Sequence, residues 1–160
     1  MKKFFQLFLI TCVFCLVQVK MYAQEKYNLT NRELKLNNGT SLKISDLKGK
    51  VVLLDFWYRG CFPCLQATPE LIKLQKEYKD QLVIIGINDR DDAEDITAYY
   101  NYKKANYFST FRTDHDISKH LTITSFPTFI IFDTDGKPVY STIGFDKKEI
   151  RKQIKQYIKK

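Results

Sequence analysis

Residues 51–64 read VVLLDFWYRGCFPC, an apolar run followed closely by two cysteines, Cys61 and Cys64. The apolar run over 51–56 has the length and the continuous pattern of a strand that is buried on both faces. If a helix begins at the first cysteine, positions i and i+3 share one helix face, so the two sulfur atoms can meet. At a helix start the backbone dipole favours a thiolate. The stretch therefore indicates a dithiol that exchanges disulfides.

Further strands and helices are predicted on both sides of this stretch. A helix over 61–78 should follow the first strand, and Pro69 within it should produce a kink. Other strands are expected at 33–36, 41–44, 82–87, 107–112, 128–132 and 139–143, other helices at 93–104 and 147–158, and a helical turn at 116–120. Strands and helices in this order predict an α/β fold whose sheet has mixed strand direction.

The first 23 residues are expected to be a secretory signal peptide, and residues 24–160 to be one domain. Lys2 and Lys3 precede an apolar run over 4–19, and Ala23 offers a small residue for cleavage. The run is shorter than the roughly 20 residues of a membrane-spanning helix. An uncleaved N-terminal membrane anchor is the alternative, and lipidation at Cys12 is another. The sequence thus predicts an exported protein, located in the bacterial periplasm.

Cleavage after Ala23 changes both the cysteine content and the charge. It removes Cys12 and Cys15, so Cys61 and Cys64 become the only cysteines in an oxidising compartment. It also removes three lysines and no acid, which lowers the net charge from +8 to +5. So mild a charge suits acidic protein partners or a membrane surface. Nucleic acid is not an expected partner, because no basic–aromatic binding motif is present.

Three motifs in order resemble the thioredoxin fold. They are Asp55-Phe56-Trp57, Cys61-Phe62-Pro63-Cys64, and Ser125-Phe126-Pro127-Thr128 before a strand. The hairpin over 33–44, the lead-in over 49–53 and the inserted helix near 93–104 resemble the exported TlpA/ResA-like branch of thiol–disulfide oxidoreductases. The resemblance covers essentially all of residues 24–160. It implies a central mixed sheet flanked by helices, with an N-terminal β-hairpin and an inserted helix.

The resemblance also implies roles for individual residues. Cys61 matches the nucleophilic cysteine, whose thiolate would form a mixed disulfide with the substrate. Cys64 matches the more buried resolving cysteine, which releases the reduced product. Asp55 matches the acid that accepts the proton of the resolving cysteine. The alternative for Asp55 is an acid at the end of the strand that reaches solvent.

Substrate contact is expected from Phe126, Pro127 and Trp57. Pro127 matches a cis-proline that packs beside the dithiol, whereas the alternative is an ordinary trans proline that opens a strand. The backbone of Phe126 would pair with an extended substrate segment, as an edge strand does. Trp57 would pack by the active-site loop or belong to the core. Arg59 would either stabilise a thiolate or be solvated.

Three positions depart from the family pattern. Gly60 stands where thioredoxins have a tryptophan before the first cysteine, and Ala67 stands where many TlpA/ResA-like reductases have a buried glutamate. Gly86 stands where thioredoxin has the lysine partner of its buried acid. Asp55 would therefore handle the proton alone.

The leading interpretation is an exported thiol–disulfide oxidoreductase that acts as a reductant and needs no cofactor. Its partners would be disulfide-containing exported proteins and a membrane-bound thiol electron donor, and the enzyme would be a monomer. A structural disulfide would close too small a loop to add much stability. A zinc site would have only His115 and His120 to add to the two sulfurs.

Two other functions stay open. A thiol peroxidase shares the fold, but peroxiredoxins have Thr or Ser where this chain has Tyr58. A copper- or metal-binding module would use the same two sulfur atoms.

Overall fold

The structure, a computed structural model, describes residues 29, 31–113 and 117–158. Their strands form a five-stranded sheet in the order β5-β4-β3-β6-β7 and a separate two-stranded sheet, β1-β2. The central strand β3 (Val51–Phe56) runs parallel to β4 (Leu82–Ile87) and antiparallel to β6 (Thr128–Phe132). The prediction of a mixed sheet is therefore confirmed, and these three strands have the predicted bounds.

The sheet ends at β5 (Phe108–Ser109) on one edge and at β7 (Pro138–Ile143) on the other. The strand predicted over 107–112 is reduced to two residues. Beyond Thr110 the backbone bonds to the loop after β4, where the N–H of Arg112 donates to the carbonyl of Asp91. The predicted N-terminal hairpin is present as β1 (Glu33–Lys35) and β2 (Ser41–Lys43). Gly39 in its turn has a φ of +83°, a conformation that favours glycine.

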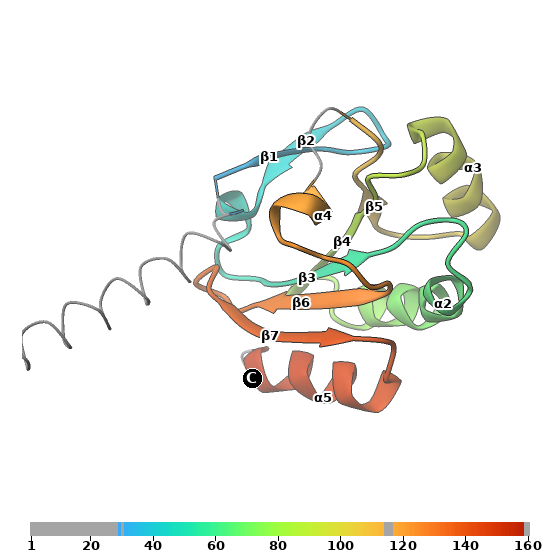
Figure 1. The fold of residues 1–160 in the computed structure, drawn as a ribbon. Coiled ribbons are helices and arrows are strands. Elements are labelled where there is room, and N and C mark those ends of the chain that lie inside the picture. The colour runs from blue at the N-terminus through green and yellow to red at the C-terminus, as the bar shows by residue number, and fades with distance from the viewer. Residues whose placement is uncertain (1–28, 30, 114–116, 159–160) are drawn as a thin grey trace, which may run out of the picture.

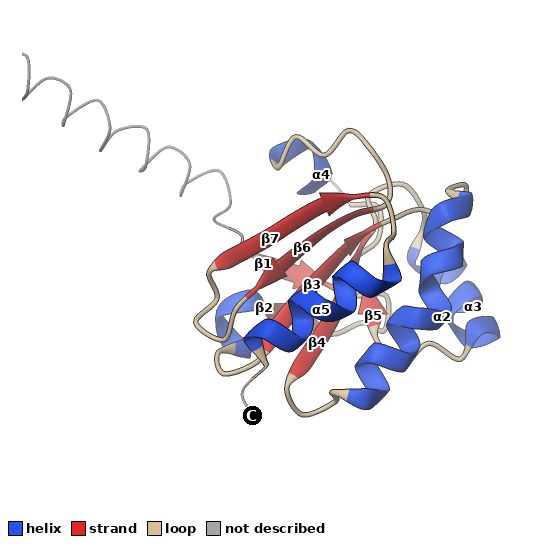
Figure 2. Cartoon of the chain, turned by 90° about the horizontal axis from the view of Figure 1, so that it is seen from below, coloured by secondary structure: helices blue, strands red, loops and turns tan. Residues whose placement is uncertain are grey.

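The two faces of the sheet are covered differently (Figure 1). The longer helices α2 (Phe62–Glu77), α3 (Ala93–Lys103) and α5 (Lys147–Tyr157) pack on one face, as Figure 2 shows from below. The hairpin, the 3-10 helix η1 (Ile44–Leu47) and the short helix α4 (Ile117–His120) cover the other. Because side chains alternate along a strand, residues 51, 53 and 55 of β3 face the helices, and residues 52, 54 and 56 face the hairpin side.

Helix α2 carries the two motif cysteines at its start. Cys61 is the N-cap residue, and Pro63 occupies the first turn, where its missing N–H costs nothing. The helix continues past Pro69 to Glu77, close to the predicted bounds of 61–78. The C-terminal helix α5 begins at Asp146, whose carboxylate accepts hydrogen bonds from the N–H groups of Lys148 and Glu149. The cysteine pair at the start of α2 thus lies just beyond the carboxyl end of the central strand β3.

The buried carboxylate of Glu70 joins α2 to α5. It pairs with Lys147 at 2.9 Å and with Arg151 at 2.7 Å, and Arg151 also pairs with Glu77. Burial alone would raise the pKa of Glu70, but hydrogen bonds and charge from Lys147 and Arg151 hold that pKa below its ordinary value. This link holds the two helices together on one side of the sheet.

None of the helices in the described part of the chain is long and apolar enough to cross a membrane. The predicted signal peptide over 1–23 lies outside the described residues.

Candidate active site

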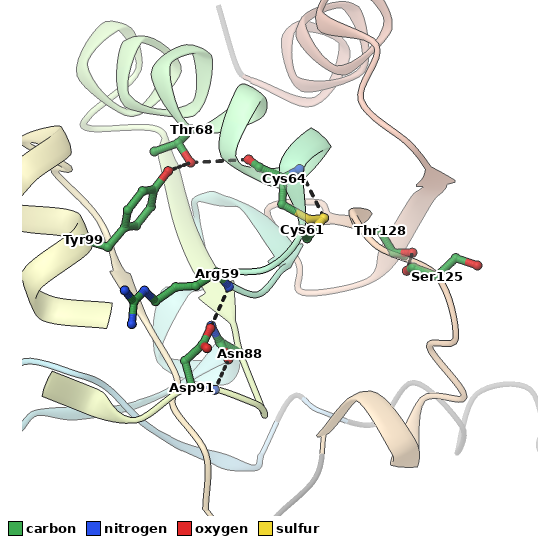
Figure 3. Close-up of a disulfide and its surroundings, with 9 residues drawn as sticks. All are labelled: Arg59, Cys61, Cys64, Thr68, Asn88, Asp91, Tyr99, Ser125 and Thr128. Carbon is green, nitrogen blue, oxygen red and sulfur yellow. Dashed lines mark hydrogen bonds between the residues drawn. A yellow bond between two sulfur atoms is a disulfide. The ribbon is translucent and has the colours of Figure 1, made fainter. Parts of the chain in front are cut away.

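A disulfide joins Cys61 and Cys64 at the start of α2, with their Cα atoms 5.3 Å apart. The backbone N–H of Cys64 donates a hydrogen bond to the Cys61 sulfur over 3.3 Å (Figure 3). The positive end of the helix dipole lies at the same place. The Cys61 sulfur is therefore positioned where a hydrogen-bond donor and the dipole both favour negative charge.

The two cysteines differ in exposure. Cys61 is 5% exposed and Cys64 is 1% exposed. Phe62 and Pro63, which lie between them in sequence, are both exposed. An incoming sulfur atom therefore reaches Cys61 more easily than Cys64, in the order that the sequence predicts.

Asp55 lies on the helix-covered face of the sheet and is 2% exposed. Its Oδ1 atom has no hydrogen-bond partner among the described residues. Burial raises the pKa of this carboxyl from 3.8 to about 8, because removal from water penalises the charged form. The alternative in which Asp55 reaches solvent is therefore wrong. A buried carboxyl with a pKa near neutrality can take up and release protons in the physiological range.

Polar groups gather beside Asp55 because its neighbour on β4 is a glycine. Gly86 is the register partner of Asp55. A Cβ atom on Gly86 would meet the hydroxyl of Ser109 at 2.6 Å and both the indole nitrogen of Trp57 and the hydroxyl of Tyr100 at 2.7 Å. The space that a side chain at 86 would need is therefore filled by three hydrogen-bonding groups. The sequence pattern singles out Gly86 but not Tyr100 or Ser109, which reach this point from α3 and β5.

Trp57 belongs to this buried cluster and not to the surface. It is 2% exposed, its ring stacks on Tyr100 at 5.3 Å between centroids, and its indole N–H donates to Ser109 over 3.0 Å. A side chain with so little exposed surface cannot contact a protein substrate directly. The prediction that Trp57 binds substrate is therefore corrected. Trp57 belongs to the core, which was the alternative.

Arg59 is held by α3 and the loop before it. Its backbone N–H donates to Asp91 over 2.7 Å, and its guanidinium pairs with Asp95 at 2.5 Å. Figure 3 shows this side chain directed away from the sulfur atoms. Arg59 therefore anchors the loop before Cys61 and does not contact the thiol.

Thr68 connects α2 to α3 one turn beyond the disulfide. Its hydroxyl donates to the carbonyl of Cys64 over 3.4 Å and accepts from the hydroxyl of Tyr99 over 3.0 Å (Figure 3). Because Tyr99 lies on α3, this bond fixes the inserted helix against the first turns of α2. The sequence pattern did not identify either residue.

Phe126 and Pro127 lie on the loop that leads into β6, and the peptide bond between them is cis. The ring of Phe126 packs edge-on against Tyr58, with centroids 5.3 Å apart. The guanidinium of Arg90 lies over both rings, 4.2 Å from the centroid of Tyr58 and 4.7 Å from that of Phe126. This contact connects the segment before Cys61 with the segment before Pro127, and Pro127 itself is buried.

In the part of the chain that the structure describes, no three His, Cys, Asp or Glu side chains form a group able to hold a metal ion. His115, one of the two histidines considered for a zinc site, lies outside it.

Comparisons with known proteins agree with this geometry. A family model described as thioredoxin-like matches residues 49–138. Thioredoxin-like protein YneN of Bacillus subtilis is 33% identical over 135 residues, covering 82% of this chain and 79% of YneN. Thiol-disulfide oxidoreductase ResA of Bacillus cereus is 33% identical over 126 residues, covering 76% of this chain and 69% of ResA.

The fold also resembles that of a solved structure. A Chlorobium tepidum protein assigned as thiol:disulfide interchange protein DsbE superposes with a TM-score of 0.71 at 26% identity, over 78% of this chain and 91% of that one. The residues matched by the thioredoxin-like family model, 49–138, include the helix that carries both cysteines and the loop before β6. The chain therefore belongs to the thioredoxin-like family, in the branch of ResA-like thiol–disulfide oxidoreductases.

Proposed function

We propose that this thiol–disulfide oxidoreductase is exported and reduces disulfides of exported proteins through Cys61 and Cys64. The observation that carries the proposal is the position of the cysteine pair at the N-terminus of α2, with the N–H of Cys64 directed at the Cys61 sulfur. Both the donor and the helix dipole lower the energy of a thiolate on Cys61. A thiolate is the attacking species in disulfide exchange.

The reaction has two exchange steps. The Cys61 thiolate attacks one sulfur of the substrate disulfide, a Cys61–substrate disulfide forms, and the other substrate sulfur leaves as a thiolate. Cys64 then loses its proton and attacks the Cys61 sulfur. The second substrate thiolate leaves, and the Cys61–Cys64 disulfide forms. Two electrons pass from the enzyme dithiol to the substrate.

Asp55 is the proposed acceptor of the Cys64 proton. Its pKa of about 8 lies close to the roughly 8.5 of an ordinary thiol, so transfer between the two groups is nearly balanced in energy. Burial of both side chains removes competing water from the pair. The proton reaches solvent after the disulfide has formed.

The substrate is proposed to lie along the loop that ends at Pro127. An extended segment would pair with the backbone of Phe126, next to the cis bond and the exposed Phe62. Protein disulfides in extended segments are therefore the expected substrates, and the enzyme would act as a monomer without a cofactor.

Export and reducing direction complete the proposal. The charged start and apolar run over residues 1–23 support export to the periplasm. An oxidising compartment does not keep a dithiol reduced, so a membrane-bound thiol donor would have to restore Cys61 and Cys64 after each turnover.

The test combines variants with a redox measurement. Cys61→Ser should abolish disulfide reductase activity, whereas Cys64→Ser should accumulate mixed disulfides with substrate proteins. A reduction potential near the roughly −270 mV of thioredoxin supports a reductant, and one near the roughly −120 mV of DsbA contradicts it. A secreted form that begins at Gln24 would support export, and a chain retained in the cytoplasm would contradict it.

A further inference from the structure

A pocket of about 300 Å³ opens directly beside Phe126, on the hairpin-covered side of the active-site loop. One wall is formed by Asp89 and Arg90, which follow β4, and the other by α4 and the segment that leads to Phe126. The proposed substrate segment runs along this same loop. Residues of the substrate that flank its cysteine would therefore reach the pocket.

Ser118 provides a buried polar group in this pocket. It is 7% exposed, and its hydroxyl oxygen has no hydrogen-bond partner among the described residues. Its backbone N–H donates to Asp89 over 2.7 Å, so the carboxylate in the pocket wall is already engaged by backbone. A buried hydroxyl without a partner costs free energy that a bound ligand can recover.

Arg90 provides the positive charge. Its side chain is exposed, and it forms no ion pair with a carboxylate in the described ranges. It stacks on Tyr58 and Phe126 at 4.2 and 4.7 Å, which uses the flat face of the guanidinium. The N–H groups point out from the edge of that plane and stay available to a carboxylate.

We propose that this pocket binds the carboxylate of an acidic residue near the cysteine of a protein substrate. The inference rests on the proposed function, because it assigns a substrate class to the same loop. A carboxylate only accepts hydrogen bonds, and the residues that line the pocket include three with side-chain donors, Arg90, Ser118 and Thr122. Arg90 also bridges the two loops beside the disulfide, so a carboxylate held there fixes the substrate next to Cys61.

Matched peptides test this selection. Disulfide-linked peptides carry one Glu at each of the three positions before and after the cysteine, and their controls carry Gln. We expect wild-type kcat/KM to favour Glu over Gln about three- to tenfold at one or two positions. Arg90→Gln should bring that ratio close to one, Arg90→Lys should retain part of it, and Ser118→Ala should reduce it. A wild-type ratio of one at every position, or an unchanged ratio in Arg90→Gln, would overturn the proposal.

Two controls make the outcomes distinct. Arg32→Gln removes an arginine that lines another pocket and should leave the ratio unchanged. Binding of unreactive peptides, with Ser in place of Cys, is measured by fluorescence anisotropy. If the enzyme reduces no peptide, the proposed function fails, but a Glu-over-Gln binding ratio that Arg90→Gln removes still supports the pocket. Equal binding of both peptides overturns it.

Oxidised glutathione separates the two sources of a carboxylate. It carries carboxylates on a small disulfide instead of on a protein segment. For a peptide site, Arg90→Gln changes the rate with glutathione by less than twofold while the peptide ratio collapses. If Arg90→Gln slows only the reduction of glutathione and leaves the Glu-over-Gln peptide ratio unchanged, the proposal of a protein substrate is contradicted.

Discussion

Asp55 and Glu70 are buried acids on the helix-covered side of the sheet, 2% and 5% exposed, but their surroundings differ. Glu70 accepts charge-assisted bonds from Lys147 and Arg151, which lower its pKa, whereas Asp55 forms no ion pair with the described residues and burial raises its pKa to about 8. The first acid is stabilised as an anion and joins two helices. The second is kept close to neutral and available for proton transfer.

Burial alone does not identify a catalytic carboxyl. Glu70 lies on α2, fifteen positions beyond Asp55 in the sequence, and its partners come from α5. Asp55 instead faces Gly86, which contributes no side chain at all. Burial, with no ion-pair partner among the described residues, therefore raises the pKa of Asp55.

The largest effect is expected for Asp55→Asn on catalysis. Without the Asp55 carboxylate as proton acceptor, release of substrate by Cys64 should slow about 100-fold at about pH 8.5, where Asp55 is mostly ionised, whereas formation of the mixed disulfide should change little. Rapid-quench trapping of the mixed disulfide measures the two steps separately. Equal rates of release in the variant and the wild type would remove Asp55 from the reaction.

The same substitution should raise stability. Between pH 4 and pH 8 the folded protein holds a proton on Asp55 that the unfolded chain has lost, so the free energy of unfolding falls as pH rises. Asp55→Asn removes this slope and should stabilise the protein by about 3 kcal/mol at pH 6, with little change below pH 4. Urea denaturation across this range measures it. A variant with the wild-type slope would show that Asp55 does not titrate with a raised pKa.

Glu70→Gln should lower the stability of the protein, in contrast to Asp55→Asn. It replaces the buried carboxylate that faces Lys147 and Arg151 with a neutral amide and should lower the free energy of unfolding by about 2 kcal/mol at pH 7. Because the folded pKa of Glu70 is lowered, its contribution is present above the ordinary pKa and is lost as pH falls through the folded value. Urea denaturation at pH 7 and pH 3 measures both the loss of stability and its dependence on pH. Glu149, which is more exposed than Glu70, provides the matched control Glu149→Gln, which should change little.

Measuring catalysis then tests whether Glu70 takes part in the reaction. Reductase activity of Glu70→Gln, measured where the variant is fully folded, should stay within twofold of the wild type. A large loss would mean that the α2–α5 link also acts on the dithiol.

The sequence predicted the central strands to the residue because their apolar runs are local patterns. Residues 51–56, 82–87 and 128–132 each read as continuous apolar segments, and each is a strand with those bounds. The order of the motifs also identified the cysteine pair and the proline whose peptide bond is cis. These features depend on residues that are close together in the chain or on a motif that the family shares.

The pairings between distant segments could not be predicted in the same way. Glu70 and Arg151 are 81 positions apart, and no periodicity shows which face of α2 meets α5. Trp57 reads equally well as a surface or a core aromatic until Tyr100 and Ser109 are placed against it. The position of Arg90 could not be predicted either, because it contacts rings from two loops that are far apart in the sequence.

The smallest effect concerns the space opposite Asp55. Gly86→Ala would place a methyl group 2.6–2.7 Å from the polar groups of Ser109, Trp57 and Tyr100, and should cost about 1–2 kcal/mol of stability. Tyr100→Phe in the same chain removes one of the three contacts and should restore part of that loss. A double-mutant cycle by urea denaturation measures the coupling. Additive losses would show that Tyr100 does not share this space with residue 86. Coupled losses would assign the space beside Asp55 to the hydroxyl of Tyr100.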